Sequence, residues 1–220
     1  MKIRAVLTCD LVDSSKLNPG DRQTLSNRMK VFAEELSNQN QTEYLVYRGD
    51  SLQGLIYDPS QALRHAISLK AYIKSYKIAS SKRSTEADIR ISIGTGQIDY
   101  RGESLLDSDG QAFHNSGRTL DSMKKKGRTL MLTTPDKQVN TEWDVILSLL
   151  EEVVEQWTIP SAEIIWRLLK GIDDKDIQFE LDISQPAVSL RKKHAGWEAI
   201  RKAINYYEDK FTVKENGDIT

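Results

Sequence analysis

The sequence has few of the residues that mark several common classes of protein. It contains one cysteine among 220 residues, which excludes an intramolecular disulfide. It has no apolar run near the roughly 20 residues that a membrane-spanning helix requires. The N-terminus Met1-Lys2-Ile3-Arg4 leads into an expected strand and does not have the pattern of a signal peptide. We therefore expect a cytoplasmic protein with no membrane partner.

An excess of charge of either sign is also absent. The 31 lysine and arginine residues are balanced by 32 aspartate and glutamate residues, so the formal net charge is −1. A balanced chain has no overall attraction for nucleic acid or for a membrane surface, and any such binding must be local. Hydrophobic residues make up 39% of the chain, which is enough for a folded core. The length fits one large domain, or a medium domain with a small one attached.

The first 136 residues alternate between strand and helix patterns. Strands are expected at 2–9, 43–47, 51–57, 88–96 and 129–133, helices at 22–38, 60–78 and 111–125, and polar loops at 74–86 and 101–110. Asp21 is expected to cap the first helix, and Gly49 to take a positive φ in a hairpin turn. The first four strands and two helices follow the βαββαβ order of a ferredoxin-like sheet with its helices on one face.

Beyond Pro135 the pattern becomes entirely helical. A linker to about 141 precedes a helix at 142–157, and short helices continue to about 210. We expect an α+β domain at 1–136, a linker helix at 137–158, a small all-α domain at 159–212 and a disordered tail at 213–220. Trp166 and Trp197 are expected in the core of the small domain.

Residues 173–191 have the pattern of a helix, a tight turn and a second helix. The segment resembles the helix-turn-helix of bacterial transcription factors, most clearly in Ile183-Ser184-Gln185 and Ala187-Val188-Ser189. It departs from that motif at Asp182, where glycine is usual and where aspartate can still adopt the left-handed conformation. Ser184 is expected to cap the second helix. The expected fold class is therefore α+β, a ferredoxin-like sheet followed by a small all-α helix-turn-helix domain.

The helix-turn-helix resemblance implies a duplex DNA partner. The second helix would present its N-terminal side chains to base edges and its last turn to phosphates. The residues implied in DNA binding are Gln185, Ser189, Arg191, Lys192 and Lys193. A protein-binding or dimerising module of the same shape is the alternative.

Two aspartates, Asp10 and Asp50, stand where expected strands give way to turns. In a ferredoxin-like sheet the first strand lies antiparallel beside the third, so the end of one abuts the start of the other. Two carboxylates placed there can share a divalent cation such as Mg or Mn, which phosphoryl chemistry on a nucleotide requires. Aspartate is also a common turn residue, so a structural role for each is the alternative.

Five segments, taken in order, resemble the class III nucleotidyl cyclase-like superfamily, and more closely the SatD-type bacterial proteins. They are 9–15, 21–22, 49–54, 90–96 and 109–118. The resemblance covers roughly residues 2–133 and implies that Asp10 and Asp50 bind metal ions. It also implies that Arg118 has a catalytic role in stabilising the triphosphate and that Asp107 helps to select the base.

Two positions depart from the cyclase pattern. The lysine that reads adenine in cyclases would fall at Val46, whose apolar side chain cannot donate a hydrogen bond. The asparagine that stabilises the transition state would fall at His114, and the neighbouring Asn115 lies about 100° around the helix. Loss of such a group typically costs a factor of about 10² to 10³ or more in rate, enough to turn an enzyme into a binding protein. The residues expected to contact a nucleotide ligand are Asp107, His114, Asn115 and Arg118.

Two features near the aspartates are expected to be structural. Cys9, beside Asp10 in a strand, is expected to be a small core residue and not a nucleophile. The run Lys124-Lys125-Lys126 ends a helix, where cations suit the helix dipole, and we expect it to be mostly solvated.

Three functions remain open. The first is a two-domain regulator, in which a cyclase-like domain binds a metal-nucleotide or related ligand and is coupled to a DNA-binding helix-turn-helix. The second is an active nucleotidyl cyclase, or another NTP-processing enzyme, with altered base choice. The third is a catalytically empty module that binds protein. A homodimer suits the first two, because cyclase-like sites are usually completed across a dimer and helix-turn-helix domains usually act in pairs.

Overall fold

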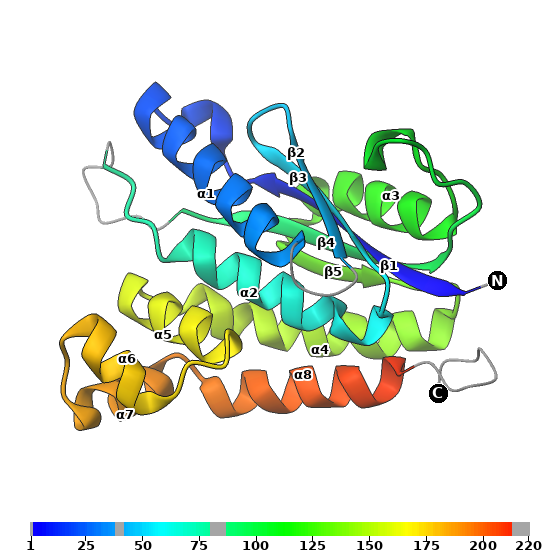
Figure 1. The fold of residues 1–220 in the computed structure, drawn as a ribbon. Coiled ribbons are helices and arrows are strands. Elements are labelled where there is room, and N and C mark those ends of the chain that lie inside the picture. The colour runs from blue at the N-terminus through cyan, green and yellow to red at the C-terminus, as the bar shows by residue number, and fades with distance from the viewer. Residues whose placement is uncertain (1, 38–41, 80–86, 213–220) are drawn as a thin grey trace.

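The fold is built on one mixed sheet. The computed structural model describes residues 2–37, 42–79 and 87–212, and five strands pair in the order β2-β3-β1-β4-β5 (Figure 1). The strands are β1 (Ile3–Leu11), β2 (Thr42–Tyr47), β3 (Ser51–Ile56), β4 (Ile89–Gln97) and β5 (Leu130–Thr133). The first four pair antiparallel, and β5 is parallel to β4 at the edge. The α+β class and the predicted βαββαβ strand order are confirmed.

Alternation along the strands divides the side chains between two layers. On one side, Leu7 and Leu52 pack in the main core with α1 (Pro19–Ser37) and α2 (Ala62–Lys74). On the other side, Val6 and Leu55 pack against Phe113 of α3 (Gln111–Lys126). The prediction of helices on one face is therefore correct for α1 and α2, and α3 covers part of the opposite face.

Two helix starts differ from the sequence-based prediction. The first helix begins at Pro19, and Asp21 lies in its first turn, where its N–H donates to Asn18 Oδ1 at 2.8 Å. The Asp21 carboxylate accepts hydrogen bonds from Tyr76 Oη at 2.8 Å and Ala79 N at 3.0 Å, so Asp21 joins two segments and is not the predicted cap. Helix α2 begins at Ala62 after a 3-10 turn, Pro59–Gln61, and ends at Lys74. The predictions for 38–41, for most of the 74–86 loop and for the tail at 213–220 lie outside the described residues.

The C-terminal helices lie on the α2 side of the sheet, with α6, α7 and α8 at the bottom of the view in Figure 1. They are α4 (Lys137–Glu155), α5 (Ile159–Leu169), α6 (Asp174–Leu181), α7 (Gln185–His194) and α8 (Trp197–Phe211). Helix α4 starts at Lys137 because Asp136 Oδ1 accepts hydrogen bonds from Gln138 N at 2.7 Å and Val139 N at 3.2 Å. The predicted linker up to 141 is therefore mostly the first turn of this helix. No helix in the described ranges is long and apolar enough to cross a membrane.

The C-terminal helices share their core with the sheet. Buried residues of α4, α5 and α8 belong to the same cluster as Leu7 and Leu52. The ring of Trp166 lies 5.7 Å from that of Phe32 and 4.8 Å from that of Tyr72, so it packs against α1 and α2 and not in a small domain of its own. A separate all-α domain is not shown, and the division of the chain at 136 and 158 stays a prediction.

Helices α5, α6 and α7 enclose a small cluster of their own, with Ile164, Ile177 and Val188 at its centre. Asp182, between α6 and α7, has φ 49° and ψ 51°, the left-handed conformation expected there. The predicted side-chain cap from Ser184 is absent from α7. Its physical reason is Pro186, which lacks one of the N–H groups that such a cap would bind.

Candidate functional site

The two aspartates meet where β1 ends and β3 begins. Asp10 lies opposite Ser51 in the antiparallel pairing, and the N–H of Leu11 donates to the carbonyl oxygen of Asp50 at 2.9 Å. A tight hairpin turn with positive φ at Arg48 (53°) and at Gly49 (76°) leads into Asp50. Neighbouring strands therefore hold both aspartates where β1 ends and β3 begins, as the strand order predicted. We call this end of the two strands the aspartate edge.

Asp10 is 9% exposed and faces two cations. Its Oδ2 lies 2.8 Å from Lys124 Nζ, and its Oδ1 lies 3.8 Å from Arg90 Nη1. Within the described chain, Oδ1 is shielded from solvent and accepts no hydrogen bond. One carboxylate oxygen is therefore occupied by an internal ammonium group, and the other has Arg90 as a more distant ion-pair partner and no hydrogen bond. Lys124, Lys125 and Lys126 are exposed, in keeping with a mostly solvated helix end, and Lys124 in addition reaches back from the end of α3 to Asp10.

Asp50 is held by two hydroxyl groups. Ser14 Oγ donates to Asp50 Oδ2 at 2.8 Å, and Ser51 Oγ donates to Asp50 Oδ1 at 3.2 Å. Ser14 lies in the short 3-10 turn Ser14–Lys16 that follows β1. The side chain is therefore fixed in place while each carboxylate oxygen keeps further acceptor capacity.

The hydroxyl of Tyr47 lies close enough to Asp10 and Asp50 for both charges to affect its pKa. Burial raises the pKa of the Tyr47 hydroxyl, and the negative charges of Asp10 and Asp50 raise it further. Both charges thus act on one phenol, which stays a hydrogen-bond donor at neutral pH. Burial and the charge of Asp10 also raise the pKa of the Cys9 thiol, in keeping with its predicted role in the core.

The oxygen chemistry of this edge fits a hard divalent cation. Mg is commonly bound by one or two carboxylates together with waters and substrate phosphates, and Asp10 and Asp50 supply those carboxylates. The Oδ1 of Asp10 accepts no hydrogen bond from the described residues and is an acceptor that a cation would satisfy. Among the described residues, no group of three or more histidine, cysteine, aspartate or glutamate side chains could hold a metal ion. The site therefore suits a cation that arrives with a phosphorylated ligand better than one held by protein alone.

Arg118 lies away from this edge within one chain. Ser116 faces the sheet, where its Oγ is 2.8 Å from Thr8 Oγ1. Arg118 follows two residues later, about 200° around the helix, and is exposed. It makes no hydrogen bond or ion pair to any residue that the structure describes. The structure does not bring Arg118 together with Asp10 and Asp50 in one copy of the chain.

The other two candidates on α3 have partners elsewhere. His114 Nε2 lies 2.7 Å from Asp109 Oδ1 on the surface. Asn115 Nδ2 donates to the carbonyl oxygen of Thr95 at 2.9 Å and so joins α3 to β4. Neither side chain is directed at the aspartate edge.

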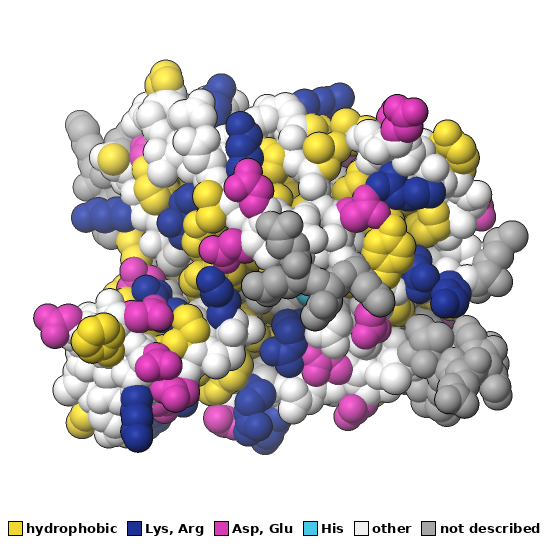
Figure 2. All heavy atoms as spheres, in the orientation of Figure 1, with side chains coloured by type: hydrophobic (Ala, Val, Ile, Leu, Met, Phe, Trp, Pro, Cys, Tyr) yellow, Lys and Arg dark blue, Asp and Glu magenta, His cyan; other side chains and the backbone are white. Residues whose placement is uncertain are grey.

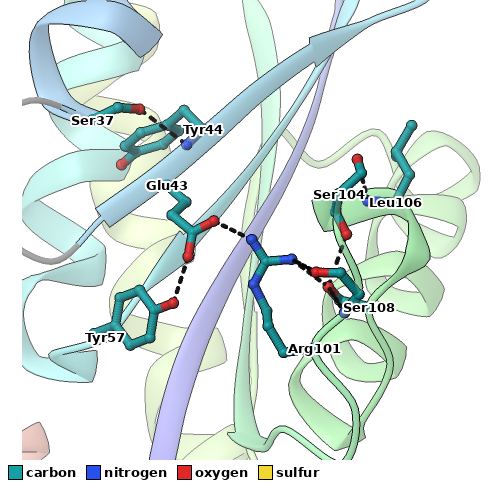
Figure 3. A network of polar contacts seen from close by, with 9 residues as sticks. Ser37, Glu43, Tyr44, Tyr57, Arg101, Ser104, Leu106 and Ser108 are labelled. Atoms are coloured by element: carbon teal, nitrogen blue, oxygen red, sulfur yellow. Dashed lines mark hydrogen bonds and ion pairs between the residues drawn. The ribbon is translucent and has the colours of Figure 1, made fainter.

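Asp107 belongs to the opposite end of the sheet. It ends the 3-10 turn Leu105–Asp107, and Leu105 packs near Val6, four residues and about 13 Å along β1 from Asp10. Figure 3 shows how this loop is fastened: Arg101 contacts Glu43 of β2 and donates to Ser108 Oγ at 2.9 Å. Tyr57 donates to the same Glu43 carboxylate.

Val46 faces the layer of α1 and α2, where it packs against the main core. The neighbouring Tyr47 faces the side of Asp10. The cyclase lysine position is therefore turned away from the candidate site, in addition to being apolar.

Several residues of the site were missed from the sequence, namely Ser14, Tyr47, Ser51, Arg90 and Lys124. Arg90 could have been found, because the alternation of β4 places it on the face opposite Ile89 and Ile91, which enter the main core. Lys124 had no such signal, since its contact with Asp10 depends on how α3 lies over the sheet.

The candidate DNA-binding residues divide into two groups. Gln185, Ser189 and Lys193 are exposed at intervals of four residues on α7, with Gln185 Nε2 3.2 Å from Ser189 Oγ. Arg191 and Lys192 instead pair with acidic side chains, at 4.0 Å from Glu163 and 3.0 Å from Asp174. On the face shown in Figure 2, basic and acidic side chains are interspersed. Gln185, Ser189 and Lys193 therefore form an exposed polar stripe on α7, whereas Arg191 and Lys192 are paired within the chain.

Comparison with known proteins gave similarities among solved structures alone. A scan against protein-family models returned no match, and a search of the curated proteins found no similar sequence. The chain is similar to the dimeric guanylyl cyclase domain of the RhoGC fusion protein from the aquatic fungus Blastocladiella emersonii, with 17% identity and a TM-score of 0.44 over 56% of this chain and 75% of that chain.

Two further similarities are of the same size. A bacterial light-regulated adenylyl cyclase shares 16% identity with a TM-score of 0.43, over 60% of this chain and 76% of that one. The GGDEF domain of FimX from Pseudomonas aeruginosa shares 13% identity with a TM-score of 0.42, over 60% of this chain and 81% of that one. These values describe a likeness in the path of the backbone, and we transfer no function from them.

Proposed function

We propose that the sheet edge at Asp10 and Asp50 binds a nucleoside triphosphate, or a related phosphorylated ligand, together with Mg or Mn. The observation that carries this proposal is the buried Oδ1 of Asp10, which accepts no hydrogen bond and has only Arg90 at 3.8 Å as an ion-pair partner, next to the strand that follows Asp50. An acceptor without a hydrogen bond in a shielded position is costly, and it is tolerated most readily where a ligand supplies the missing bond. Asp10 and Asp50 would hold the cation, which would neutralise charge on the phosphates. The relation to SatD-type proteins implied by the sequence belongs to the same proposal.

Lys124 gives the site a means of accepting an anion. Its ammonium group lies on Asp10 Oδ2 at 2.8 Å, and its side chain is 58% exposed. A divalent ion at Asp10 would repel the ammonium group of Lys124. A phosphate oxygen is an alternative partner for that flexible side chain. Arrival of a metal-phosphate ligand would therefore move Lys124 from carboxylate to phosphate without leaving either charge unpaired.

The contacts of α3 favour binding over turnover. His114 is paired with Asp109, and Asn115 is committed to the carbonyl of Thr95. Neither is free to stabilise a transferring phosphoryl group, the role implied by the cyclase resemblance. We therefore rank a ligand-binding regulator above an active NTP-processing enzyme, which is the alternative.

The test measures binding and product formation separately. Calorimetry with Mn and each of the four ribonucleoside triphosphates should detect binding that Asp10→Asn or Asp50→Asn weakens at least about tenfold, since each removes a charged cation ligand. Asp13→Asn is the matched control, because Asp13 is exposed and pairs with Lys16 at 2.9 Å. Binding that is absent, or unaffected at both site variants, would refute the proposal. Any cyclic or pyrophosphate product in chromatography of labelled nucleotides would favour the enzyme.

The outward position of Arg118 favours completion of the site by a second copy of the chain. Arg118 is exposed and makes no hydrogen bond or ion pair with any described residue of its own chain, whereas Asp10 and Asp50 lie elsewhere. If two copies form one site, a random equimolar mixture of Asp10→Asn and Arg118→Ala chains should restore about a quarter of all sites, because each heterodimer regains one of its two. Recovery of ligand binding in the mixture, with none in either variant alone, is the expected result. No recovery would assign Arg118 another role.

DNA binding by α7 is a second candidate function. It is favoured by the exposed stripe of Gln185, Ser189 and Lys193 on a helix that follows a tight turn. Fluorescence anisotropy with random-sequence duplex DNA should show salt-sensitive binding that Lys193→Glu weakens. Lys202→Glu, on α8, is the control. Absent or salt-insensitive binding would leave a regulator that acts through protein partners.

A further inference from the structure

Gln53 of β3 carries a second buried oxygen without a partner. Its Oε1 is shielded from solvent and accepts no hydrogen bond from the described part of the chain. Gln53 lies opposite Thr8 of β1, and Ser51, two residues earlier on β3, lies opposite Asp10. The two oxygens that accept no hydrogen bond, Gln53 Oε1 and Asp10 Oδ1, therefore belong to adjacent rows of the same pair of strands.

Both side chains lie on the α3 side of the sheet. Thr8, between the positions of Val6 and Asp10, contacts Ser116 of α3, and Asp10 contacts Lys124 of α3. On β3, Leu55 packs with Phe113, whereas Leu52 and Ile56 enter the core on the other side. Alternation then places Gln53 with Leu55 and Ser51 on the α3 side. Diagonal neighbours on paired strands lie about 7–8 Å apart, so Gln53 is one short step from Asp10.

Helix α3 lies mainly over β1, β4 and β5, while the 3-10 turn Leu105–Asp107 meets β2 and β3 farther along. The amide of Gln53 therefore lies near the aspartate edge on the α3 side of the sheet, while α3 lies mainly over the strands beyond β3. An amide offers one acceptor oxygen and two donor hydrogens, which suits a neutral polar group and not a phosphate.

We propose that Gln53 recognises the ribose of the nucleotide, with its Oε1 accepting a hydrogen bond from a sugar hydroxyl. The proposal rests on the proposed function, in which Asp10 and Asp50 hold the cation bound to the phosphates. In a nucleotide the sugar is the group attached directly to the phosphates, and the base lies one group farther away. An acceptor one diagonal step from the metal-binding carboxylate is therefore within reach of the sugar. Gln53 would make the site prefer ribonucleotides to deoxynucleotides.

The test compares sugars on the full-length protein. Calorimetry in Mn would use each of the four ribonucleoside triphosphates and its 2′-deoxy and 3′-deoxy forms. The wild type should bind the ribonucleotide about tenfold more tightly than one of the two deoxy forms, the usual effect of one hydrogen bond. Gln53→Met should bind all three forms alike, with the affinity of the wild type for that deoxy form. Gln23→Met, on the surface of α1, should keep the wild-type preference.

Two results would overturn the inference. One is equal binding of ribose and deoxyribose forms by the wild type, and the other is a ribose preference that survives in Gln53→Met. In either case Asp10-dependent binding would still stand. Absence of any Asp10-dependent nucleotide binding would instead refute the proposed function, and this inference with it.

A second measurement guards against a folding defect. Because Oε1 has no partner in the described chain, Gln53→Met should unfold at a denaturant concentration equal to or higher than the wild type. A clear fall in that midpoint would show that the amide has a structural partner, which contradicts its role as a free acceptor.

Discussion

Replacing Lys124 with methionine should have opposite effects on stability and on metal binding. The substitution removes the ammonium group from Asp10 Oδ2, at 2.8 Å, and leaves Arg90 at 3.8 Å as the remaining cation. The side chain of Asp10 is 13% exposed and that of Lys124 is 58% exposed, so the pair is intermediate between a fully exposed and a fully buried ion pair. Exposed pairs contribute about 0.2–1 kcal/mol, and loss of one partner from a buried pair costs about 3–5 kcal/mol. We expect a loss of about 1.4 kcal/mol in the free energy of unfolding without metal.

The affinity for a divalent ion should rise by the same amount of free energy. In the wild type a divalent ion must displace the ammonium group from Asp10, whereas in Lys124→Met it does not. A difference of about 1.4 kcal/mol corresponds to about tenfold tighter binding of Mn. Urea denaturation in a chelator and calorimetry with Mn alone measure the two quantities.

Lys125→Met is the matched control, since Lys125 is exposed on the same turn of α3 and pairs with no described residue. It should change neither quantity. If Lys124→Met binds Mn no more tightly than Lys125→Met does, the ammonium group does not compete with a cation at Asp10. That result would refute the reasoning even if the variant is less stable.

Three further predictions concern stability. Burial raises the pKa of Asp88, but the ion pair with Lys70 at 2.8 Å outweighs it and lowers that pKa. Asp88→Asn should therefore lower the free energy of unfolding by about 3 kcal/mol near pH 7, measured by urea denaturation. The contribution of Asp88 is complete above about pH 4 and is lost as the pH falls through the lowered pKa. Burial lowers the pKa of His65 to about 4, so the wild type should lose up to about 3 kcal/mol between pH 6.5 and pH 4, and His65→Gln should show a smaller loss over the same range. A Cβ on Gly94 would lie 2.3 Å from the backbone N of Ser116. Gly94→Ala should therefore push α3 away from β4 and lower the free energy of unfolding by about 3 kcal/mol. An unchanged denaturation midpoint would contradict this packing.

Local patterns in the sequence were sufficient for most of the sheet. Alternation of apolar residues in 3–11 and 89–97 identifies two central strands, and the Arg48-Gly49 turn fixes the hairpin between β2 and β3. These signals depend on neighbours within a few residues, so one sequence reveals them. The same patterns placed Asp10 and Asp50 at one edge of the sheet.

Features that depend on contacts between distant segments could not be predicted in this way. An apolar helix face shows that Trp166 is covered, and it does not show that Phe32 and Tyr72 cover it. The pairing of Lys124 with Asp10 likewise spans more than a hundred residues. The start of α4 is a different case, because Asp136 before an apolar periodic segment is a local capping signal that was overlooked.

The aromatic contact of Trp166 with Phe32 and Tyr72 bears on how this protein can be dissected. A fragment that ends at residue 136 would present those two rings, and the neighbouring core that α4, α5 and α8 cover, directly to water. Such a fragment is expected to aggregate or to require a detergent or a partner, even though its sheet is complete. Residues 1–136 are thus a poor unit for isolation, because the C-terminal helices cover one side of their core.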